Sequence, residues 1–436
     1  MAKIVFMGAG SSVFVKNVVG DCMLSPVLTD SEFALYDIDA ARLDDSRRML
    51  EALNKNMGGH AVITAHLGVQ HRREALKGAH YVVNAIQVGL YEPCTVTDFE
   101  VPKKYGLRQT IGDTLGIGGI FRALRTIPVM QDFADDMAAV CPDAWFLNYT
   151  NPMAMLTGYM QRYTSVKTIG LCHSVQVCAK RLLEGLGMAY DPAISTVIAG
   201  INHQAWLLEI HDKEGRDLYP EIKRRALARS EKHEDMVRYE LMRRFGYYVT
   251  ESSEHSAEYT PYFIKDKYPE LIERFNIPLD EYPRRCVKNI EKWAVQRDTL
   301  TNNPDILHQL SREYASHIMA AMETNVPYKI GGNVINHGLI ENLPPNACVE
   351  VPCLVDGSGI APCFVGSLPE QCAALNRTSV NVQLLTIEAA RTKKKDYIYQ
   401  AALLDPHMGS ELSIDDIVAL CDDMIAAHAG WLPEYH

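Results

Sequence analysis

The segment Lys167-Thr168-Ile169-Gly170-Leu171-Cys172-His173-Ser174 carries a short apolar run directly into a thiol and an imidazole. A helical pattern over residues 175–186 follows it. A strand that ends in reactive side chains and turns into a helix is where an open α/β sheet binds its ligands. Further along, Gly200-Ile201-Asn202-His203 presents a second imidazole between apolar runs. These two segments form the first candidate site, and its chemistry depends on the rest of the chain.

The N-terminus contains the start of a nucleotide-binding unit. The apolar run Lys3–Met7 ends in Gly8-Ala9-Gly10-Ser11-Ser12, and a helical spacing of apolar residues begins after it. Glycines at such a turn let the backbone approach a pyrophosphate, and the helix N-terminus offers its N–H groups. The match to the dinucleotide fingerprint is incomplete, because Val13 stands where the third glycine belongs. We expect Gly8, Gly10 and Ser11 to contact a cofactor here.

An acidic residue ends the second predicted strand. The run Glu32-Phe33-Ala34-Leu35-Tyr36 leads into Asp37-Ile38-Asp39. A carboxylate at this position accepts hydrogen bonds from a ribose diol and favours NAD over its phosphorylated form. The alternative is an N-cap for a helix over residues 40–53, and both Asp37 and Asp39 suit either role. We expect Asp37 to bind the cofactor.

Strands and helices alternate through the first half of the chain. Buried strand patterns occupy residues 61–64, 81–86, 144–149 and 167–172, and helical patterns occupy residues 42–54, 119–140 and 153–163. This alternation predicts an α/β fold with a doubly wound parallel sheet of the Rossmann type. We therefore expect residues 1–190 to form an NAD-binding domain.

Polar residues follow the last three predicted strands of this domain. Because the carboxyl ends of parallel strands share one edge, these side chains are expected to line one crevice. They are Asn84 and Gln87, Asn148 and Asn151, and Cys172 and His173. The glycine-rich stretch 109–119 is long for a plain connection and is expected to cover the crevice.

The pattern changes after Pro192. Residues 197–199, 205–210, 328–333 and 348–352 are strand-like, and residues 221–244, 281–325 and 368–426 are helical in pattern. The segment 247–259 is dense in groups that can move protons. We expect residues 191–436 to form an α+β domain for substrate, metal and oligomerisation, in the architecture of lactate and malate dehydrogenases.

The composition excludes several classes of protein. The 436-residue chain has a net charge of −11, so it has no general basic field for nucleic acid or anionic membranes. No apolar stretch is long enough to cross a bilayer. The 11 cysteines are an odd number without a repeating frame, which is typical of a reducing compartment. We expect a cytoplasmic protein.

A thiolate and a neutral imidazole suit a borderline transition metal such as Mn, Fe, Co, Ni or Zn. With Cys172 and His203 as ligands, several positions stay open for substrate oxygens, and the metal would stabilise an enolate. His173 is a candidate general acid and a tyrosine a candidate base. Each residue also has a plain alternative, because cysteine is often simply buried and His203 suits a core or dehydrogenase-type histidine. The residues alone thus indicate an NAD-dependent oxidoreductase. They leave open whether a metal takes part in its reaction.

At these residues the chain resembles the family 4 glycoside hydrolases, and within them the α-galactosidase branch. The resemblance runs along nearly the whole chain. It is carried by residues 6–11, Tyr91-Glu92-Pro93-Cys94-Thr95-Val96-Thr97-Asp98-Phe99-Glu100, Asp113-Thr114-Leu115-Gly116, residues 121–128, Leu147-Asn148-Tyr149-Thr150-Asn151-Pro152-Met153, residues 171–176 and residues 200–203. The family's shorter glycine turn also accounts for the missing third glycine.

The resemblance implies a glycosidase that works by redox and elimination, an exception to the usual pair of carboxylates. C3 of the sugar is oxidised by NAD, C2 is deprotonated, and the bond from C1 to the leaving oxygen breaks. Water then adds and the ketone is reduced again. By the same resemblance, Cys172 and His203 hold a divalent metal, typically Mn, and His173 is the acid. Asn151 contacts the sugar by the same resemblance, and Asn148, at the end of the preceding strand, is expected to contact it as well.

The C2 base is assigned by the resemblance to Tyr259, in Glu258-Tyr259, with Tyr248 and Asp266 as open alternatives. Cys172-His173 resembles the α-galactosidase branch rather than the branch acting on phosphorylated sugars. The α-glucuronidase and α-galacturonidase branches share it, and Arg284 or Arg285 would then face the carboxylate.

Two readings outside the glycosidases remain open. One is a 2-hydroxyacid dehydrogenase that uses NAD, and the other is a sensor that binds NAD without catalysis. The expected partner is a small glycoside, with a homodimer or homotetramer as the assembly.

Overall fold

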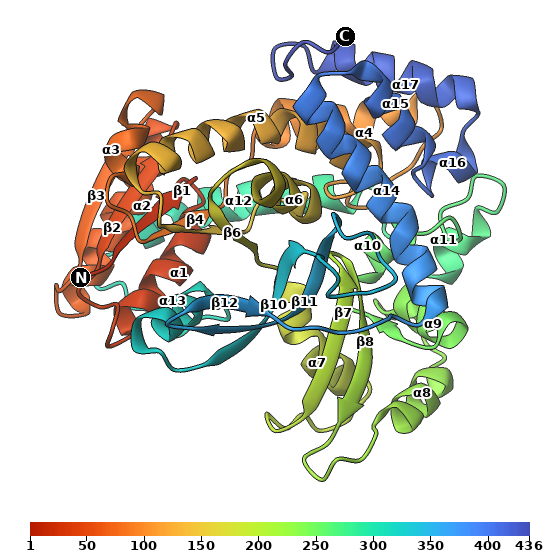
Figure 1. Ribbon diagram of the computed structural model, residues 1–436, viewed down its shortest axis with the longest axis horizontal. Helices are drawn as coiled ribbons and strands as arrows, with labels where there is room; N and C mark the ends of the chain where they lie inside the picture. The colour runs from red at the N-terminus through yellow and green to blue at the C-terminus, as the bar shows by residue number, and fades with distance from the viewer.

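Six parallel strands form the N-terminal part of the sheet in the computed structural model, which describes residues 1–436. They are β1 (Lys3–Met7), β2 (Glu32–Asp37), β3 (Val62–Leu67), β4 (Tyr81–Asn84), β5 (Trp145–Asn148) and β6 (Lys167–Gly170). They lie in the order β3-β2-β1-β4-β5-β6 (Figure 1). This is the order of dinucleotide-binding folds, so the predicted Rossmann-type sheet is confirmed. β4 and β6 end earlier than predicted, at Asn84 and Gly170.

Helices connect these strands and cover both faces of the sheet. They are α1 (Ser12–Leu24), α2 (Ala40–Asn56), α3 (Arg72–Leu76), α4 (Val96–Lys103), α5 (Gly116–Val140), α6 (Met153–Tyr163) and α7 (His173–Gly185), with one 3-10 turn (Val69–His71) and one π turn (Leu90–Thr95). Asp39 caps α2, because its side chain accepts hydrogen bonds from the N–H groups of Ala41 and Arg42.

The C-terminal half continues the same sheet with antiparallel strands. β10 (Tyr328–Ile335) pairs with β6 through Asn333 and Gly170, and β11 (Cys348–Asp356) pairs with β10. The sheet goes on through β7 (Ser195–Ile201), β8 (Gln204–His211) and β9 (Tyr248–Val249), and β12 (Gly359–Pro362) pairs with β11. The molecule is therefore an α/β fold with a Rossmann-type half and an α+β half. The domain boundary at residue 190 stays a prediction.

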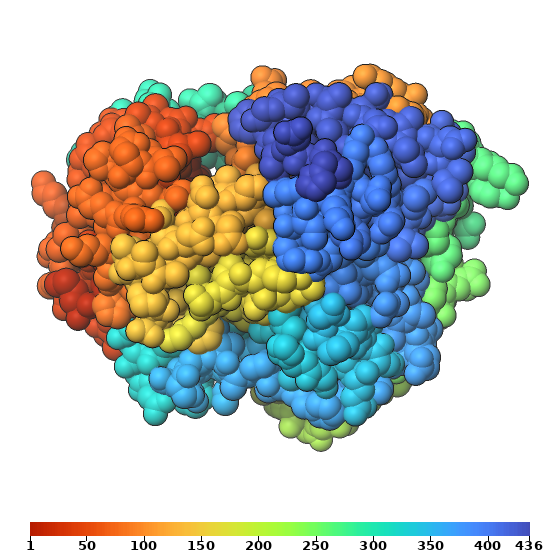
Figure 2. Space-filling view, turned by 45° about the horizontal axis from the view of Figure 1, so that its top comes forward, coloured from red at the N-terminus to blue at the C-terminus, as the bar shows by residue number.

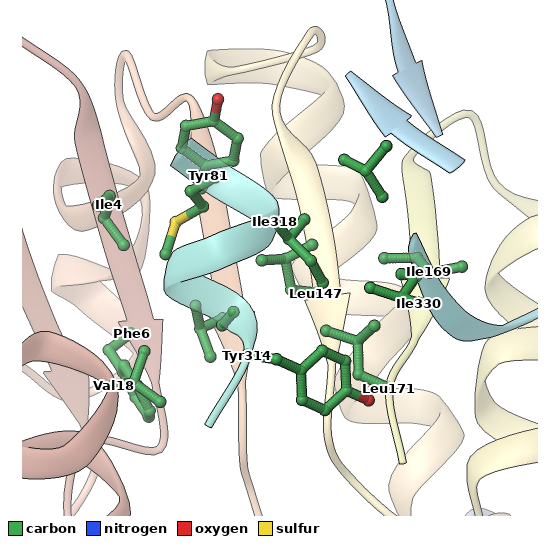
Figure 3. Packing of buried hydrophobic residues seen from close by; sticks show 14 of the residues in the cluster. Ile4, Phe6, Val18, Tyr81, Leu147, Ile169, Leu171, Tyr314, Ile318 and Ile330 are labelled. Carbon is green, nitrogen blue, oxygen red and sulfur yellow. The ribbon is translucent and has the colours of Figure 1, made fainter. Parts of the chain in front are cut away.

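Alternate residues of β1 enter two different hydrophobic cores. Ile4 and Phe6 face one core, and Val5 and Met7 face the other. A central parallel strand is buried on both faces in this way, because helices cover both. Figure 3 shows the first core, where α13 (Ala315–Thr324) crosses the N-terminal strands and places Ile318 against them. A helix from the C-terminal half thus completes the N-terminal core.

The opposite face is covered by α5, α6 and the C-terminal helices. These are α14 (Glu370–Thr392), α15 (Lys395–Leu403), α16 (Met408–Glu411) and α17 (Ile414–Ala427). Side chains from α5, α6, α14, α15 and α17 meet in the second core. Figure 2 shows this face, where the C-terminal helices (blue) lie beside α5 and α6 (amber and yellow).

Two regions predicted as continuous helices are broken. Residues 221–244 contain α8 (Tyr219–Ala228) and α9 (Met236–Phe245), because Arg229 adopts an extended conformation. Residues 281–325 contain α12 (Glu281–Thr301) and α13, with a connection over residues 302–314. Asn303-Pro304 follows α12, and a residue before proline disfavours the helical conformation.

The remaining helices of the second half are short. The segment 247–259 forms β9 and α10 (Ser253–Glu258), and α11 (Glu270–Arg274) follows. None of the helices is both long and apolar enough to cross a membrane.

Candidate functional site

A cavity of about 500 Å³ lies over the carboxyl ends of β4, β5 and β6. Its walls include Gln87 after β4, Asn151 after β5, and Cys172 and His173 after β6. The second half of the chain contributes His203, Glu251 and His255. The crevice predicted at this edge therefore exists, and both halves of the molecule form it.

Three side chains in this cavity converge as metal ligands would. The ligand atoms of Cys172, His203 and Glu251 all lie within 4.8 Å of one another. The Cys172 Sγ is 4.0 Å from Glu251 Oε2, and His203 Nε2 is 3.5 Å from the same oxygen. The predicted pair Cys172 and His203 is thus brought together, and Glu251 joins it from the connection between β9 and α10.

Local structure places each of these residues. Cys172 is the N-cap of α7, directly after β6. His203 occupies the two-residue turn between β7 and β8, where Ile201 pairs with Gln204. Its φ of 34° lies in the left-handed region, which is unfavourable for a histidine and typical of functional sites.

The electrostatics of the cluster suit a cation. Burial lowers the pKa of His203 to about 4, so the imidazole is neutral and its nitrogen can bind a metal. Burial, with the nearby Glu350 and Glu251 carboxylates, raises the pKa of the Cys172 thiol well above its usual range. A thiolate here therefore needs a positive charge beside it. One sulfur, one nitrogen and one oxygen donor fit a borderline divalent metal.

A second polar group faces the cavity beside the cluster. His255 Nε2 lies 3.5 Å from Asp113 Oδ1, yet neither atom forms a hydrogen bond. Burial opposes charge on His255, but Asp113 and Glu251 outweigh it and raise its pKa to about 9. Asn151 donates to the other Asp113 oxygen at 3.1 Å. Since buried polar atoms are rarely left unpaired, His255 and Asp113 are suited to bind substrate hydroxyls.

The glycine turn after β1 has the shape of a nucleotide cradle. Gly8 has φ of 86°, and a Cβ atom there would lie 2.8 Å from the carbonyl oxygen of Ala85. Gly10 N donates to Asp37 Oδ2 at 2.6 Å, which places the predicted ribose ligand beside the turn. Ser11 is exposed at the start of α1. Gln87 lines the neighbouring cavity wall. The residues present therefore fit a dinucleotide.

His173 lies at the cavity wall with its side chain 48% exposed. Its Nε2 is 2.5 Å from Glu313 Oε2, in the segment before α13. Its Nδ1 has no partner in the chain, so this nitrogen is free to face a ligand.

Two other predicted site residues lie behind the cavity wall. Tyr259 is buried, and its hydroxyl donates to Thr114 Oγ1 at 2.9 Å, next to His203. Burial raises the pKa of Tyr259 well above its usual range. Asn148 is fully buried, and its amide binds Asn84, Thr157 and the Thr150 backbone. Asn148 is predicted to contact the sugar, whereas its side chain lies in the buried hydrogen-bond network below the cavity.

The two alternative bases lie away from the cavity. The Tyr248 hydroxyl donates to Asp235 at 3.0 Å within a separate core. The Asp266 backbone binds Glu411. Neither residue lines the cavity or contacts a residue of the metal-ligand cluster, whereas Tyr259, behind the wall, bonds Thr114 next to His203.

Several residues of the site were not predicted. They are Glu251, His255, Arg122 and Tyr282. Asp113 was noted in the covering loop and in a motif of the resemblance, but was given no role. The density of proton-moving groups in residues 247–259 was a usable signal for Glu251 and His255. Arg122 lies in a segment that carries the resemblance, but its place in the site was not predicted, because only the fold brings it to Tyr282 OH, at 3.0 Å.

Sequence models of two known protein families match the chain, one in each half. The model for family 4 glycosyl hydrolase matches residues 3–188, and the model for the family 4 glycosyl hydrolase C-terminal domain matches residues 198–408. The chain belongs to glycosyl hydrolase family 4. The resemblance inferred from the sequence motifs is thereby confirmed.

Known members of family 4 share the length and fold of this chain. An alpha-galactosidase from Bacillus subtilis is 63% identical over 436 residues and covers 100% of both chains. A 6-phospho-beta-glucosidase from Thermotoga maritima, solved with manganese, NAD+ and glucose-6-phosphate, has a TM-score of 0.80 at 21% identity over 99% of this chain and 100% of its own.

The predicted similarity in fold to the lactate and malate dehydrogenases is also confirmed. Malate dehydrogenase from Plasmodium falciparum, solved with NADH, has a TM-score of 0.51 at 12% identity over 90% of this chain and 99% of its own.

Proposed function

We propose that this family 4 enzyme is an α-galactosidase that requires NAD and a divalent metal, with Mn as the metal. The observation that carries the proposal is the convergence of Cys172, His203 and Glu251 on the cavity that adjoins the glycine cradle. The chain's 63% identity to an alpha-galactosidase over its full length supports galactose as the sugar.

The residues present would hold both groups. Gly8, Gly10, Ser11 and Asp37 would bind NAD, with Gln87 nearer its reactive end. Cys172 and His203 would bind the metal, with Glu251 as a third ligand. When bound, NAD would supply a hydride acceptor, and the metal would supply Lewis-acid stabilisation of negative charge on the sugar oxygens.

The protein's own side chains orient the sugar and move its protons. His255 and Asp113 bind hydroxyl groups through cavity atoms that form no hydrogen bond within the chain, and Asn151, which donates to Asp113, binds beside them. Tyr259 is the proposed base for the proton on C2, and Thr114 accepts its hydrogen bond and orients its hydroxyl. Burial raises the pKa of Tyr259, so the charge of a divalent metal bound at the nearby His203 would be needed to favour its phenolate form. His173 donates a proton to the leaving oxygen, and Glu313 fixes the orientation of its ring. Solvent deuterium should enter C2 of the product, and Tyr259→Phe should abolish this exchange.

A uronide substrate is less well supported by the charges. Arg285 lines the cavity but is paired with Glu254 at 2.7 Å and with Glu281 at 2.8 Å. Arg284 is paired with Glu281 at 2.9 Å. The cations proposed for a sugar carboxylate are thus already neutralised within the chain. α-Glucuronide and α-galacturonide hydrolysis are therefore expected to be minor.

The direct experiment is hydrolysis of p-nitrophenyl α-galactoside with and without NAD, Mn and a thiol reductant. The α-glucoside and the α-glucuronide serve as comparison substrates. We expect release from the galactoside only when both NAD and Mn are present, and no net NADH. Release without NAD would overturn the redox mechanism. Steady NADH formation from a 2-hydroxyacid, with no glycoside cleaved, would make the protein a dehydrogenase.

We further propose that the enzyme is a cytoplasmic homodimer or homotetramer. Closed, even-numbered assemblies are the commonest among soluble oligomers. Light scattering on the purified protein at several concentrations tests the assembly, and a monomer at all of them would refute it.

A further inference from the structure

A row of buried residues crosses the sheet directly below the active-site cavity. Six residues on six neighbouring strands, from β4 to β7, are aligned one with the next. In this order they are Asn84, Asn148, Gly170, Asn333, Glu350 and Gly200. We call them the polar row. The first three are the last residues of β4, β5 and β6, so the cavity lies immediately beyond them.

The candidate metal ligands follow the polar row after a few positions. Cys172 comes two residues after Gly170, and His203 comes three residues after Gly200. At its other end the row is aligned with the last residue of β1, where the glycine cradle begins. Strands that slide past each other would carry these segments with them. The alignment of the row therefore sets how far apart the two ligands lie.

The polar side chains of the row are enclosed and bind one another. Asn84, Asn148 and Asn333 are 0% exposed, and Glu350 is 1% exposed. Asn84 Nδ2 donates to Asn148 Oδ1 at 2.9 Å, and Asn333 Nδ2 donates to Glu350 Oε1 at 2.9 Å. Glu350 has no cation beside it, and a carboxyl group buried in this way lowers the stability of a fold. A residue that is unfavourable for stability is expected to serve the site.

The two halves of the sheet meet at joints that are only one residue pair wide. β6 and β10 are aligned only at Gly170 and Asn333, and β11 and β7 only at Glu350 and Gly200. At the first joint, a Cβ atom on Gly170 would lie 2.8 Å from the Asn333 Cβ, so only glycine permits this approach. Because the backbone pairing is so short, the alignment at both joints depends on contacts of side chains.

Glu350 acts on both joints. Its Oε1 accepts from Asn333 Nδ2, and the same amide donates across the first joint to the Gly170 carbonyl at 3.3 Å. At the second joint lies Asn202, the residue before His203. Burial raises the pKa of Glu350 to about 7, whereas the amides of Asn333 and Asn202 act to lower it, so both amides lie beside the carboxyl group. Glu350 thus connects the two segments that carry the metal ligands.

We propose that Glu350 is a positioning residue of the metal site, and that its bond to Asn333 holds Cys172 and His203 at the separation a divalent metal requires. Glu350 does not line the cavity, so it acts through the strands and not as a ligand. This role rests on the proposed function, in which Cys172 and His203 are the ligands.

Calorimetry with Mn on the folded full-length chain tests this role. Glu350→Leu removes the acceptor for Asn333, and we expect Mn binding to weaken about tenfold to a hundredfold. Glu350→Gln keeps an acceptor oxygen, so its affinity for Mn should equal that of the wild type. NAD affinity should be unchanged in both variants, because the cradle lies at the far end of the row.

Val355→Ala on the same strand is the matched control for lost stability. Val355 is 0% exposed and belongs to the first hydrophobic core, outside the polar row. Its truncation should lower the thermal midpoint, because it leaves a cavity, and should not change the affinity for Mn. If Glu350→Leu fails to fold, Asn333→Leu removes the same bond and decides by the same measurement.

The outcomes separate this role from the proposed function. A lower thermal midpoint in Glu350→Leu with unchanged Mn affinity would mean that Glu350 only supports the fold, and would overturn the proposal. Binding of Mn by Glu350→Gln as weak as that by Glu350→Leu would also overturn it, because the charge and not the bond would then matter. If the wild type itself does not bind Mn, the proposed metal site is wrong and the role of Glu350 falls with it.

Discussion

The buried ion pair between Asp98 and Arg125 should be among the most sensitive points of the fold. Arg125 donates from Nη1 and Nη2 to the two Asp98 oxygens at 3.0 and 2.6 Å. The side chains are 0% and 4% exposed for Arg125 and Asp98. His428, beyond α17, also contacts Asp98, at 2.9 Å. Arg125 Nε donates to the Val88 carbonyl, next to Gln87, so the pair supports the proposed cofactor wall.

Asp98→Asn should lower the free energy of unfolding by about 3–5 kcal/mol, because it leaves the Arg125 charge buried without a counter-ion. The asparagine keeps one acceptor oxygen and turns an NH₂ group toward the remaining guanidinium donor. Glu100→Gln on the same helix is the matched control. Its carboxylate is 60% exposed and pairs with Lys103 at 2.7 Å, so its loss should cost about 0–1 kcal/mol.

Urea unfolding followed by the fluorescence of the 4 tryptophans measures both effects. A loss for Asp98→Asn no larger than that for Glu100→Gln would refute the reasoning. The double variant Asp98→Leu with Arg125→Met provides a second check, since removing both charges should be less costly than removing one.

Three further predictions concern the metal, the cofactor and pH. Cys172→Ser should weaken Mn binding about tenfold to a hundredfold, measured by calorimetry with the folded protein, and unchanged binding would exclude Cys172 as a ligand. Gly8→Ala should lower the thermal midpoint and weaken NAD binding about tenfold or more, because its Cβ would press on the Ala85 carbonyl; intact NAD affinity would contradict the cradle. Burial raises the pKa of Asp405 to about 7, although the backbone N–H groups that bind its carboxylate act to lower that pKa. Its contribution to stability is therefore full below its unfolded pKa of about 3.9 and is lost as pH rises through about 7. Relative to the wild type, Asp405→Asn should thus become more stable between pH 5 and 8, and a constant difference in thermal midpoint over that range would refute the assignment.

Local patterns in the sequence were sufficient to predict the strands and the glycine turn of the N-terminal half. The apolar runs at residues 3–7, 32–36 and 81–84 are buried on both faces, so their composition alone marks them as parallel strands. The turn Gly8-Ala9-Gly10-Ser11 needs only neighbouring residues, and the structure places Asp37 beside it. Cys172 could likewise be assigned to the sheet edge, because it directly follows a strand.

Other features depend on contacts between residues far apart in the sequence, which local patterns cannot predict. The connection over residues 302–314 is held to α1 because Asp21 accepts hydrogen bonds from Ser311, and it carries Glu313 to His173. No periodicity in either segment indicates this contact. Asn148 was predicted on the sugar because it ends a strand, but its side chain points into the sheet and binds Asn84.

The sequence by itself determined the nucleotide-binding half, the family and the two metal-ligand candidates Cys172 and His203. Each of these features is encoded in short segments of consecutive residues, so it can be recognised without knowledge of the fold. Only the tertiary structure decided that Glu251 completes the cluster and that His255 meets Asp113. The physical reason is that these groups come from elements far apart in sequence, and the packing of β10 against β6 and of α13 on the N-terminal sheet brings them to one edge.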